Sequence, residues 1–470
     1  MRKILLALLL LVTMVVNMFA LTSCLFTNPD DSGEEEGKIN ITFYHTMGAN
    51  LREVLDFYVE EFEKLYPHIN IIHEQVGSYD DVRDTISTEL MVGGQPNVAY
   101  CYPDHVALYN VAQAVVTLDQ YINSTKEIER ADGTTEILGL TQAQKDDFIQ
   151  AYYEEGRQFG DNEMYTMPLS KSTEVLYYNV DFFKEHNLTP PTTWDELEAL
   201  CATIKTIDPE CIPLGYDSES NWFITMCEQL KTPYTSATGE HFLFDNEANH
   251  AFVKKFQEWY AKGYVTTQEI YGAYTSGLFV ATSGQKSYMS IGSSAGATHQ
   301  RPAKDEATGK YPFEVGIVPI PQADETNKKV ISQGPSLCIL DSYNAAENEA
   351  AWLFVKFLTT NVSFQAEFSE ASGYVPVIKS VANDPFYQDF LAKADGGNGI
   401  AALSAKVCLE QESYYYVSPA FNGSSTARDE VGRLLQECIL LTGSDEAVMA
   451  EIKNIFKKAI DECKYQTDAG

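Results

Sequence analysis

The chain has 470 residues, of which 44% are hydrophobic and 12% aromatic, a composition typical of a folded globular protein. Its formal net charge is −34 and no basic cluster is present to face phosphates, which argues against nucleic-acid binding. We interpret the excess of acidic residues as a source of solubility, and a local pocket can still differ in sign from the surface as a whole.

The first 24 residues predict export. Arg2 and Lys3 precede an apolar run, and residues 21–24 read Leu-Thr-Ser-Cys. A basic start, a hydrophobic centre and small residues before a cleavage point describe a secretory signal peptide. The Leu-x-Ser-Cys ending resembles the bacterial lipobox, so we expect residues 1–23 to be a lipoprotein signal peptide and Cys24 to carry lipid. An ordinary signal peptide with a chance cysteine and an uncleaved anchor remain alternatives, because about 17–20 apolar residues can span a bilayer.

A polar tether follows over residues 24–37. Residues 27–37 read TNPDDSGEEEG, with five acidic residues and almost nothing apolar. Such a segment cannot bury enough surface to fold, so we expect it to be disordered. A lipid anchor and a flexible leash suit a protein held at the outer face of a membrane.

The body, residues 38–465, is long enough for two domains, and its first part alternates strands and helices. Period-two and helical patterns predict strands at 39–44, 69–73 and 97–102, and helices at 51–65, 82–90 and from 104. This order predicts a parallel sheet with helices on its faces. Ligands bind beyond the carboxyl ends of such strands, which here are rich in aromatic and hydroxyl groups: 44–47, 76–79 and 100–104.

A second α/β body follows. Thr193 and Glu196 form a capping box that predicts the start of a helix. Apolar patterns predict strands at 175–178 and 315–319, and helices at 248–262, 345–360 and 444–463.

The sequence carries no signature of an enzyme or of a metal site. No CxxC pair occurs, and no nucleophile elbow, zinc-protease helix or phosphate loop is present. Cys101 and Cys338 lie in apolar runs and are expected to be buried thiols, whereas Cys201 and Cys211 bracket a short loop and could form a disulfide. The 67 acidic residues make chance carboxylate pairs uninformative about glycoside hydrolysis. We therefore expect no metal, no cofactor and no catalysis.

A collinear set of short motifs spans nearly the whole body: FYHTM at 43–47, FEKLYP at 62–67, GSY at 77–79, MPLSKSTEVLYYN at 167–179, PTTWDEL at 191–197, MSIGSS at 289–294, GPSL at 334–337 and SGYVP at 372–376. In this order the motifs resemble the extracellular solute-binding proteins of ABC importers, in the large sugar-binding group. Within this group, the motifs look most like those of the glycerol-3-phosphate-binding member.

The resemblance implies an α/β fold with two lobes, a hinge and a ligand cleft between the lobes. One lobe would combine 38–168 with 334–372, and the other 169–333 with 375–465. Gly, Pro and Ser cluster near the implied crossings, at 168–173, 332–335 and 373–376, which suits segments that bend without carrying core. Ligand binding would then close the lobes about the hinge.

The resemblance also implies a set of ligand-binding residues. Aromatic faces would pack on the C–H side of a sugar, a carboxylate would accept hydrogen bonds from hydroxyls, and Ser and Gly would admit backbone donors. Purely structural roles are the alternative: a helix start for Tyr79, a core position for Trp222 and a plain turn for Ser293 and Ser294. The candidates are Tyr79, Asp104, Ser172, Trp222, Ser293, Ser294, Gly334 and Tyr374.

One departure from the family pattern bears on the ligand. The glycerol-3-phosphate-binding member uses a C-terminal arginine against the phosphate, but residues 414–427 contain no basic residue, and Arg428 matches a different family position. A buried phosphate without a fixed cation needs many backbone donors instead. We therefore expect a neutral mono- or oligosaccharide that is passed to an ABC permease by a monomeric protein. Glycerol 3-phosphate or a glycerophosphodiester is the alternative ligand, and a ligand-sensing or adhesive surface lipoprotein is the alternative class.

Overall fold

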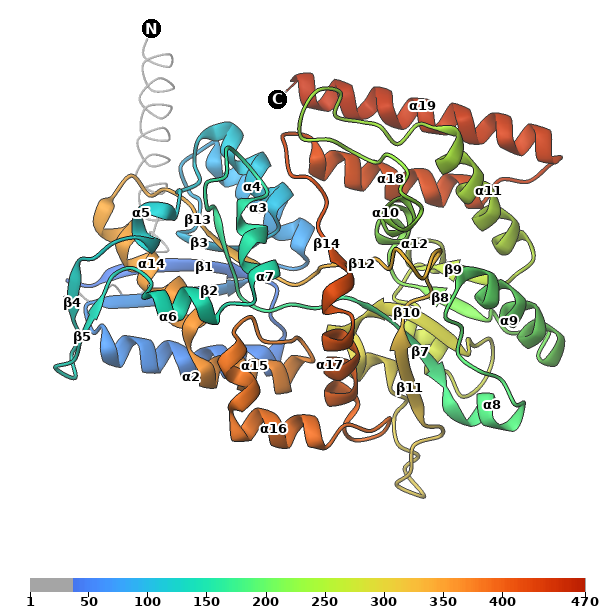
Figure 1. Ribbon diagram of the computed structural model, residues 1–470, viewed down its shortest axis with the longest axis horizontal. Helices are drawn as coiled ribbons and strands as arrows, with labels where there is room; N and C mark the ends of the chain where they lie inside the picture. The colour runs from blue at the N-terminus through green and yellow to red at the C-terminus, as the bar shows by residue number, and fades with distance from the viewer. Residues whose placement is uncertain (1–36, 470) are drawn as a thin grey trace, which may run out of the picture.

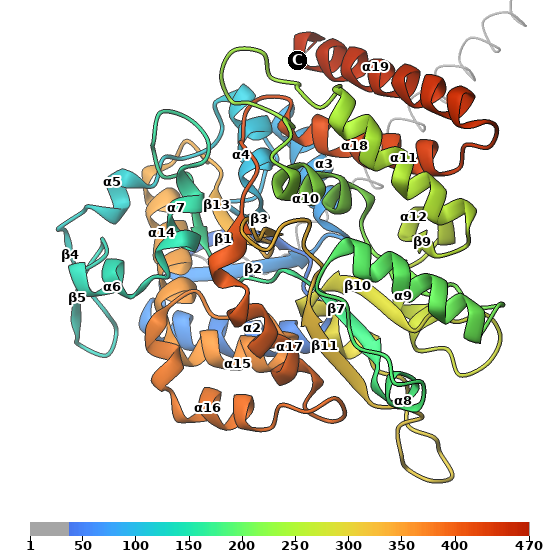
Figure 2. The same ribbon diagram turned by 45° about the vertical axis from the view of Figure 1, so that its right-hand side comes forward.

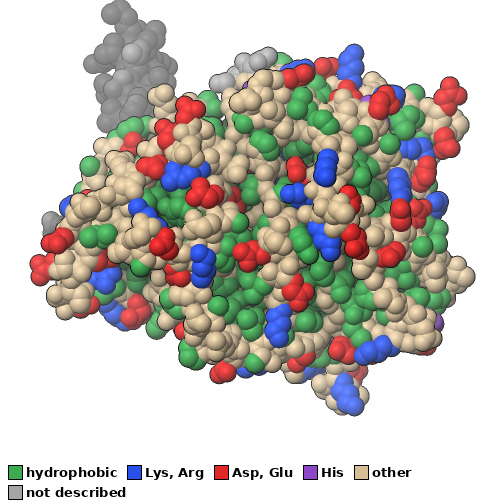
Figure 3. Space-filling model, in the orientation of Figure 1, with side chains coloured by type: hydrophobic (Ala, Val, Ile, Leu, Met, Phe, Trp, Pro, Cys, Tyr) green, Lys and Arg blue, Asp and Glu red, His purple; other side chains and the backbone are tan. Residues whose placement is uncertain are grey.

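The computed structural model describes residues 37–469, which form two α/β lobes side by side (Figure 1). The predicted signal peptide, Cys24 and nearly all of the predicted tether lie outside the described residues. Within the described part, no helix is long and apolar enough to cross a membrane. Charged side chains of both signs are scattered over the face seen in Figure 3.

Lobe 1 is built on a five-stranded sheet in the order β2-β1-β3-β13-β6. The three predicted strands are confirmed and run parallel, but β13 lies antiparallel between β3 and β6. The sheet is therefore mixed rather than parallel, because a strand from far along the chain completes it. The strands are β1 (Ile39–His45), β2 (Ile69–Gln75), β3 (Val98–Cys101), β6 (Thr166–Pro168) and β13 (Ser336–Ile339).

Helices on both faces of this sheet bury two apolar clusters, one with residues of α2, α14 and α15 and one with residues of α3 and α4. The apolar stripe of α2 faces inward, with Leu55, Tyr58, Val59 and Phe62 all buried. A capping box between Ser78 and Asp81 begins α3. The main helices are α2 (Ala49–Leu65), α3 (Tyr79–Leu90), α4 (Pro103–Tyr109), α14 (Ala345–Thr360) and α15 (Val362–Ser372). Smaller elements are α5 (Asp119–Ile122), the hairpin β4 (Glu127–Glu129) and β5 (Thr135–Ile137), α6 (Gln142–Asp147) and α7 (Gln150–Glu154).

Lobe 2 has a second mixed sheet in the order β11-β7-β10-β8-β9. Its strands are β7 (Glu174–Asn179), β8 (Leu214–Tyr216), β9 (Val265–Thr267), β10 (Met289–Ser293) and β11 (Val315–Pro319). The helices are α8 (Val180–Glu185), α9 (Trp194–Ile207), α10 (Glu219–Leu230), α11 (Glu247–Ala261), α12 (Gln268–Tyr271), α13 (Ser276–Phe279), α18 (Ser424–Ile439) and α19 (Asp445–Ala469). The predicted capping box at Thr193 and Glu196 begins α9, as expected.

The three predicted crossing segments lie side by side between the lobes. Ser172 pairs with Gln333, and Lys171 pairs with Val375. A two-stranded sheet continues this connection, in which β12 (Val330–Ile331) pairs with β14 (Tyr415–Tyr416). Backbone hydrogen bonds therefore tie together segments that are far apart in the sequence.

The third crossing differs from the prediction. Residues 375–394, which we expected in lobe 2, stay with lobe 1, because Val375, Val377, Tyr387 and Phe390 are buried in its core. The chain passes over along α17 (Ile400–Glu410), which follows α16 (Pro385–Ala392). One set of α17 side chains packs in the lobe 1 core and another in lobe 2, and both views show this helix between the lobes (Figures 1 and 2).

Candidate ligand site between the lobes

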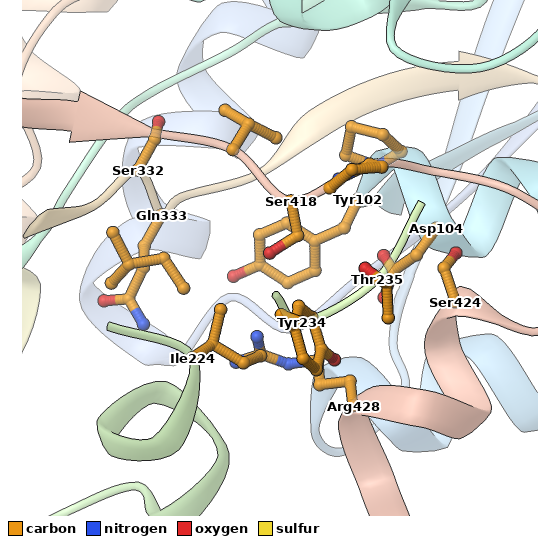
Figure 4. A pocket seen from close by; sticks show the side chains of 14 residues that line it. Tyr102, Asp104, Ile224, Tyr234, Thr235, Ser332, Gln333, Ser418, Ser424 and Arg428 are labelled. Carbon is orange, nitrogen blue, oxygen red and sulfur yellow. The ribbon is translucent and has the colours of Figure 1, made fainter. Parts of the chain in front are cut away.

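A cavity lies where the two lobes and the crossing segments meet. It encloses about 610 Å³ of empty volume, part of it open to solvent. Lobe 1 contributes one short run of chain, lobe 2 contributes two helices and a loop, and the crossings form the back. The lining residues are Tyr102, Pro103, Asp104, Ile224, Tyr234, Thr235, Ile331, Ser332, Gln333, Val417, Ser418, Pro419, Ser424 and Arg428 (Figure 4).

The lobe 1 wall follows directly from the end of a strand. Tyr102 comes after β3 and is the N-cap residue of α4, so Asp104 lies in the first turn of that helix, where a negative charge is favoured. One oxygen of Asp104 accepts a hydrogen bond from the backbone N–H of His105, at 3.1 Å. Burial raises the pKa of the Tyr102 hydroxyl, which therefore stays protonated and able to donate.

The lobe 2 wall carries the opposite charge. Arg428 extends from α18 past Tyr234 toward Ile224 (Figure 4). Its guanidinium donates a hydrogen bond to the side-chain oxygen of Asn221 on α10. Asn221 in turn donates to the buried carboxylate of Glu174, at 3.0 Å. The cavity therefore contains a fixed cation, Arg428, which directly follows the stretch without basic residues, 414–427.

The lining combines balanced charges with many neutral polar groups. Asp104 and Arg428 are its only charged members in the described part of the chain. Thr235 Oγ1 and Gln333 Oε1 are buried, and neither atom has a hydrogen-bond partner among the described residues. Because buried polar atoms are normally bonded, these two are suited to groups of a ligand or to water.

Asp104 is the one sequence-predicted residue that lines the cavity itself. Tyr79 and Tyr374 lie next to it on lobe 1: their hydroxyls are 3.3 Å apart, and the Tyr79 ring lies 5.0 Å from the ring of Tyr102. Tyr79 and Tyr374 thus pack behind Tyr102, which itself lines the cavity.

Ser172 and Gly334 lie in the crossing segments, and Ser293 and Ser294, at the end of β10, contact the first of these segments. The hydroxyl of Ser293 donates to that of Ser172, at 3.4 Å, and Ser294 Oγ accepts from the backbone N–H of Thr173, at 3.1 Å. Gly334 has φ +98°, and a Cβ there would lie 2.4 Å from the carbonyl oxygen of Ser170, so only glycine fits. In this structure the four residues join the crossing segments rather than face the cavity.

Trp222 differs from the expectation of a ligand-stacking ring. Its side chain is fully buried in the lobe 2 core, and the rings of Tyr216 and Phe256 stack on it at 4.9 and 3.8 Å. The alternative of a core role, left open by the sequence, describes its position. The aromatic residue that lobe 2 brings to the cavity is Tyr234.

Pattern reading also missed Arg428, Thr235 and Gln333. Arg428 is the first basic residue after Lys406, and this isolation could have marked it as a candidate. Its family position, however, gave no reason to place it in the cavity. All eight cysteines among the described residues are buried and free, Cys201 and Cys211 included.

Known proteins match this architecture along most of the chain. A family model for bacterial extracellular solute-binding proteins matches residues 58–394. The sn-glycerol-3-phosphate-binding periplasmic protein UgpB of Escherichia coli K12 is 22% identical over 383 residues, which cover 78% of this chain and 80% of that protein.

Solved structures of the same fold cover nearly the whole described chain. UgpB from Mycobacterium tuberculosis, in complex with glycerophosphocholine, has a TM-score of 0.68 at 16% identity and covers 91% of this chain and 99% of its own. Maltose-bound MalE3 of T. maritima has a TM-score of 0.66 at 16% identity, with 89% and 99% covered. The two-lobe fold is thus shared with binding proteins. The chain belongs to the family of bacterial extracellular solute-binding proteins, the non-enzymatic receptors of ABC importers.

Proposed function

We propose that this protein captures a neutral carbohydrate, a mono- or oligosaccharide, outside the cell and delivers it to an ABC permease. The observation that carries the proposal is the lining of the cavity, in which the charges of Asp104 and Arg428 balance and the other residues combine neutral polar groups with apolar side chains.

A polyhydroxy ligand matches this lining because each hydroxyl can both donate and accept. Asp104 would accept from ligand hydroxyls and Arg428 would donate to ligand oxygens, and hydrogen bonds to charged groups are the stronger ones. The rings of Tyr102 and Tyr234 offer faces for the C–H side of a sugar. A phosphate dianion would gain from Arg428 but would be repelled by Asp104.

A glycerophosphodiester is the second candidate, and Arg428 is the observation that favours it. A phosphodiester is a monoanion, so one guanidinium can balance its charge. The E. coli relative is named for glycerol 3-phosphate, and the M. tuberculosis structure holds glycerophosphocholine. The MalE3 structure holds maltose, so similar proteins fall on both sides of this choice.

Contacts across the cleft would hold the closed state around the ligand. Arg83 on α3 of lobe 1 contacts Asp429 on α18 of lobe 2, at 3.2 Å, and Ser425 Oγ, at 3.1 Å. Arg428, which follows Ser425 by less than one helical turn, faces the cavity on the same helix. Ligand binding and lobe closure would thus act on one end of α18.

We further propose that Cys24 is lipid-modified and holds the receptor at the outer face of the membrane. The Leu-Thr-Ser-Cys ending of the apolar run supports this proposal. Mass spectrometry of the native N-terminus tests it: a diacylated Cys24 is expected, and an intact Met1 or a cut elsewhere would refute it.

Titration calorimetry tests the ligand. The probes are maltose, raffinose, glycerol 3-phosphate and glycerophosphocholine, measured against the wild type, Asp104→Ala, Arg428→Ala and a surface control, Asp146→Ala. We expect a sugar to bind, and each cavity variant to lose at least tenfold in affinity, about 1.4 kcal/mol, with the control unchanged. Binding of a phosphate ester without binding of either sugar would overturn the carbohydrate proposal.

A further inference from the structure

The guanidinium of Arg428 is held from behind by a chain of buried polar groups. Arg428 donates to the side-chain oxygen of Asn221, Asn221 Nδ2 donates to Glu174 Oε1 at 3.0 Å, and the hydroxyl of Tyr216 donates to Glu174 Oε2 at 2.6 Å. Tyr216, Glu174 and Asn221 are all nearly fully buried. They come from β8, the start of β7 and the first turn of α10, so three elements meet behind the cavity wall.

The chemistry of this chain of bonds fixes its direction. In its ionised form, Glu174 can only accept hydrogen bonds, so it takes the NH₂ group of Asn221 and leaves the amide oxygen facing Arg428. If the amide turned over, its NH₂ group would face the guanidinium, and two donors would oppose each other. The carboxylate therefore sets the orientation of Asn221, and Asn221 sets the position of the arginine.

We propose that Asn221 and Glu174 are positioning residues for the ligand site, which act on the ligand only through Arg428. The inference rests on the proposed function, because it assigns Arg428 a place in ligand binding. Neither positioning residue lines the cavity. The same buried groups could instead serve only to stabilise lobe 2, and the experiment must separate the two roles.

Asn348 in lobe 1 provides a matched control. It is also a buried asparagine between a carboxylate and a donor: its NH₂ group donates to Asp341 at 2.7 Å, and its oxygen accepts from the hydroxyl of Ser342 at 3.2 Å. It does not line the cavity. Asn348→Ala should thus reproduce the loss of a buried amide without disturbing Arg428.

A double-mutant cycle tests the proposal, with maltose and glycerophosphocholine as probes. We expect Asn221→Ala to weaken binding at least tenfold in the wild-type background and less than twofold in the Arg428→Ala background. Glu174→Met should weaken it similarly. Glu174→Gln, whose amide oxygen can still accept from Asn221, should retain more of the affinity, and Asn348→Ala should leave it unchanged. Equal losses from Asn221→Ala in both backgrounds would overturn the proposal.

Crystal structures of the ligand-free proteins provide a readout that needs no ligand. We expect the Arg428 guanidinium to keep one position in the wild type and in Asn348→Ala, and to leave it in Asn221→Ala and Glu174→Met. An unchanged arginine in those two variants would refute the positioning role. If neither probe binds the wild type, the position of Arg428 in these crystal structures still decides this inference.

Discussion

The two walls of the cavity are built in different ways. Lobe 1 supplies three consecutive residues, 102–104, at the end of one strand, and its carboxylate is bonded by a backbone N–H of its own helix. Lobe 2 supplies residues from α10, the loop at 234–235 and α18, and its guanidinium depends on two further buried side chains. The acidic wall is thus a local structure and the basic wall a tertiary one, so distant substitutions should disturb the basic wall more.

The cores of the two lobes offer the largest test of this contrast, because each contains a fully buried tryptophan. Trp352 in lobe 1 donates its indole N–H to the carbonyl of Leu138, at 2.8 Å, whereas the indole nitrogen of Trp222 in lobe 2 has no hydrogen-bond partner among the described residues. We expect either substitution by alanine to lower the free energy of unfolding by about 3–5 kcal/mol.

Phenylalanine variants sharpen this comparison. Trp352→Phe should cost about 1–3 kcal/mol more than Trp222→Phe, because it leaves the buried carbonyl of Leu138 without its donor. Urea denaturation followed by circular dichroism measures both. Equal costs would show that the indole hydrogen bond contributes nothing. If Trp222→Phe is folded but binds ligand much more weakly, Trp222 contributes to ligand binding after all.

The buried carboxylate behind the basic wall predicts a pH effect of intermediate size. Burial raises the pKa of Glu174 to about 7, despite the hydrogen bonds from Tyr216 and Asn221 that lower it. A carboxyl whose folded-state pKa lies above its unfolded value destabilises the native state as pH rises from about 4.5 to 7, and the penalty is constant above that. Its full size is about 3 kcal/mol.

We therefore expect Glu174→Gln to be more stable than the wild type above pH 7, by up to about 3 kcal/mol, and nearly equal to it at pH 4.5. Thermal or urea unfolding at several pH values measures the difference. An exposed glutamate on α18, changed as Glu437→Gln, should show no such trend. A Glu174→Gln variant less stable than the wild type at pH 8 would contradict the expected sign.

The ion pair across the cleft predicts the smallest effect. Asp429→Ala removes the contact with Arg83, which keeps its two partners within lobe 1, Asp80 and Asp84. Because Asp429 is about half exposed, the pair is worth about 0.5–1 kcal/mol. We expect a roughly three- to fivefold loss of ligand affinity and a larger radius of gyration in solution scattering. Glu437→Ala on the same helix is the control, and a scattering profile equal to that of the wild type would argue against an interlobe role.

Much of lobe 1 could be predicted because its signals are local. The periodicity of α2 and the alternation of β1 lie within single elements. The rule that ligands bind beyond the carboxyl ends of strands pointed to residues 100–104, which include Asp104, a residue that lines the cavity. The insertion of β13 and the packing of residues 375–394 on lobe 1 could not be predicted, since each depends on pairing or packing between distant segments.

Trp222 shows why the lobe 2 wall was harder to predict. Nine of the twelve residues of α10 are buried, so its sequence pattern marks no face that turns toward a ligand. Only the packing of α10 against its neighbours places Ile224 at the cavity and Trp222 in the core. Arg428 depends in the same way on the docking of α18.

The position of β13 has a consequence for the order of events during synthesis. In the lobe 1 sheet β3 and β6 are not neighbours, because β13 fills the place between them. A ribosome that has made the first 170 residues has produced four of the five strands but cannot join them into one sheet. Pairing of such distant segments is slow, so the newly made chain stays unfinished until residue 339 has emerged.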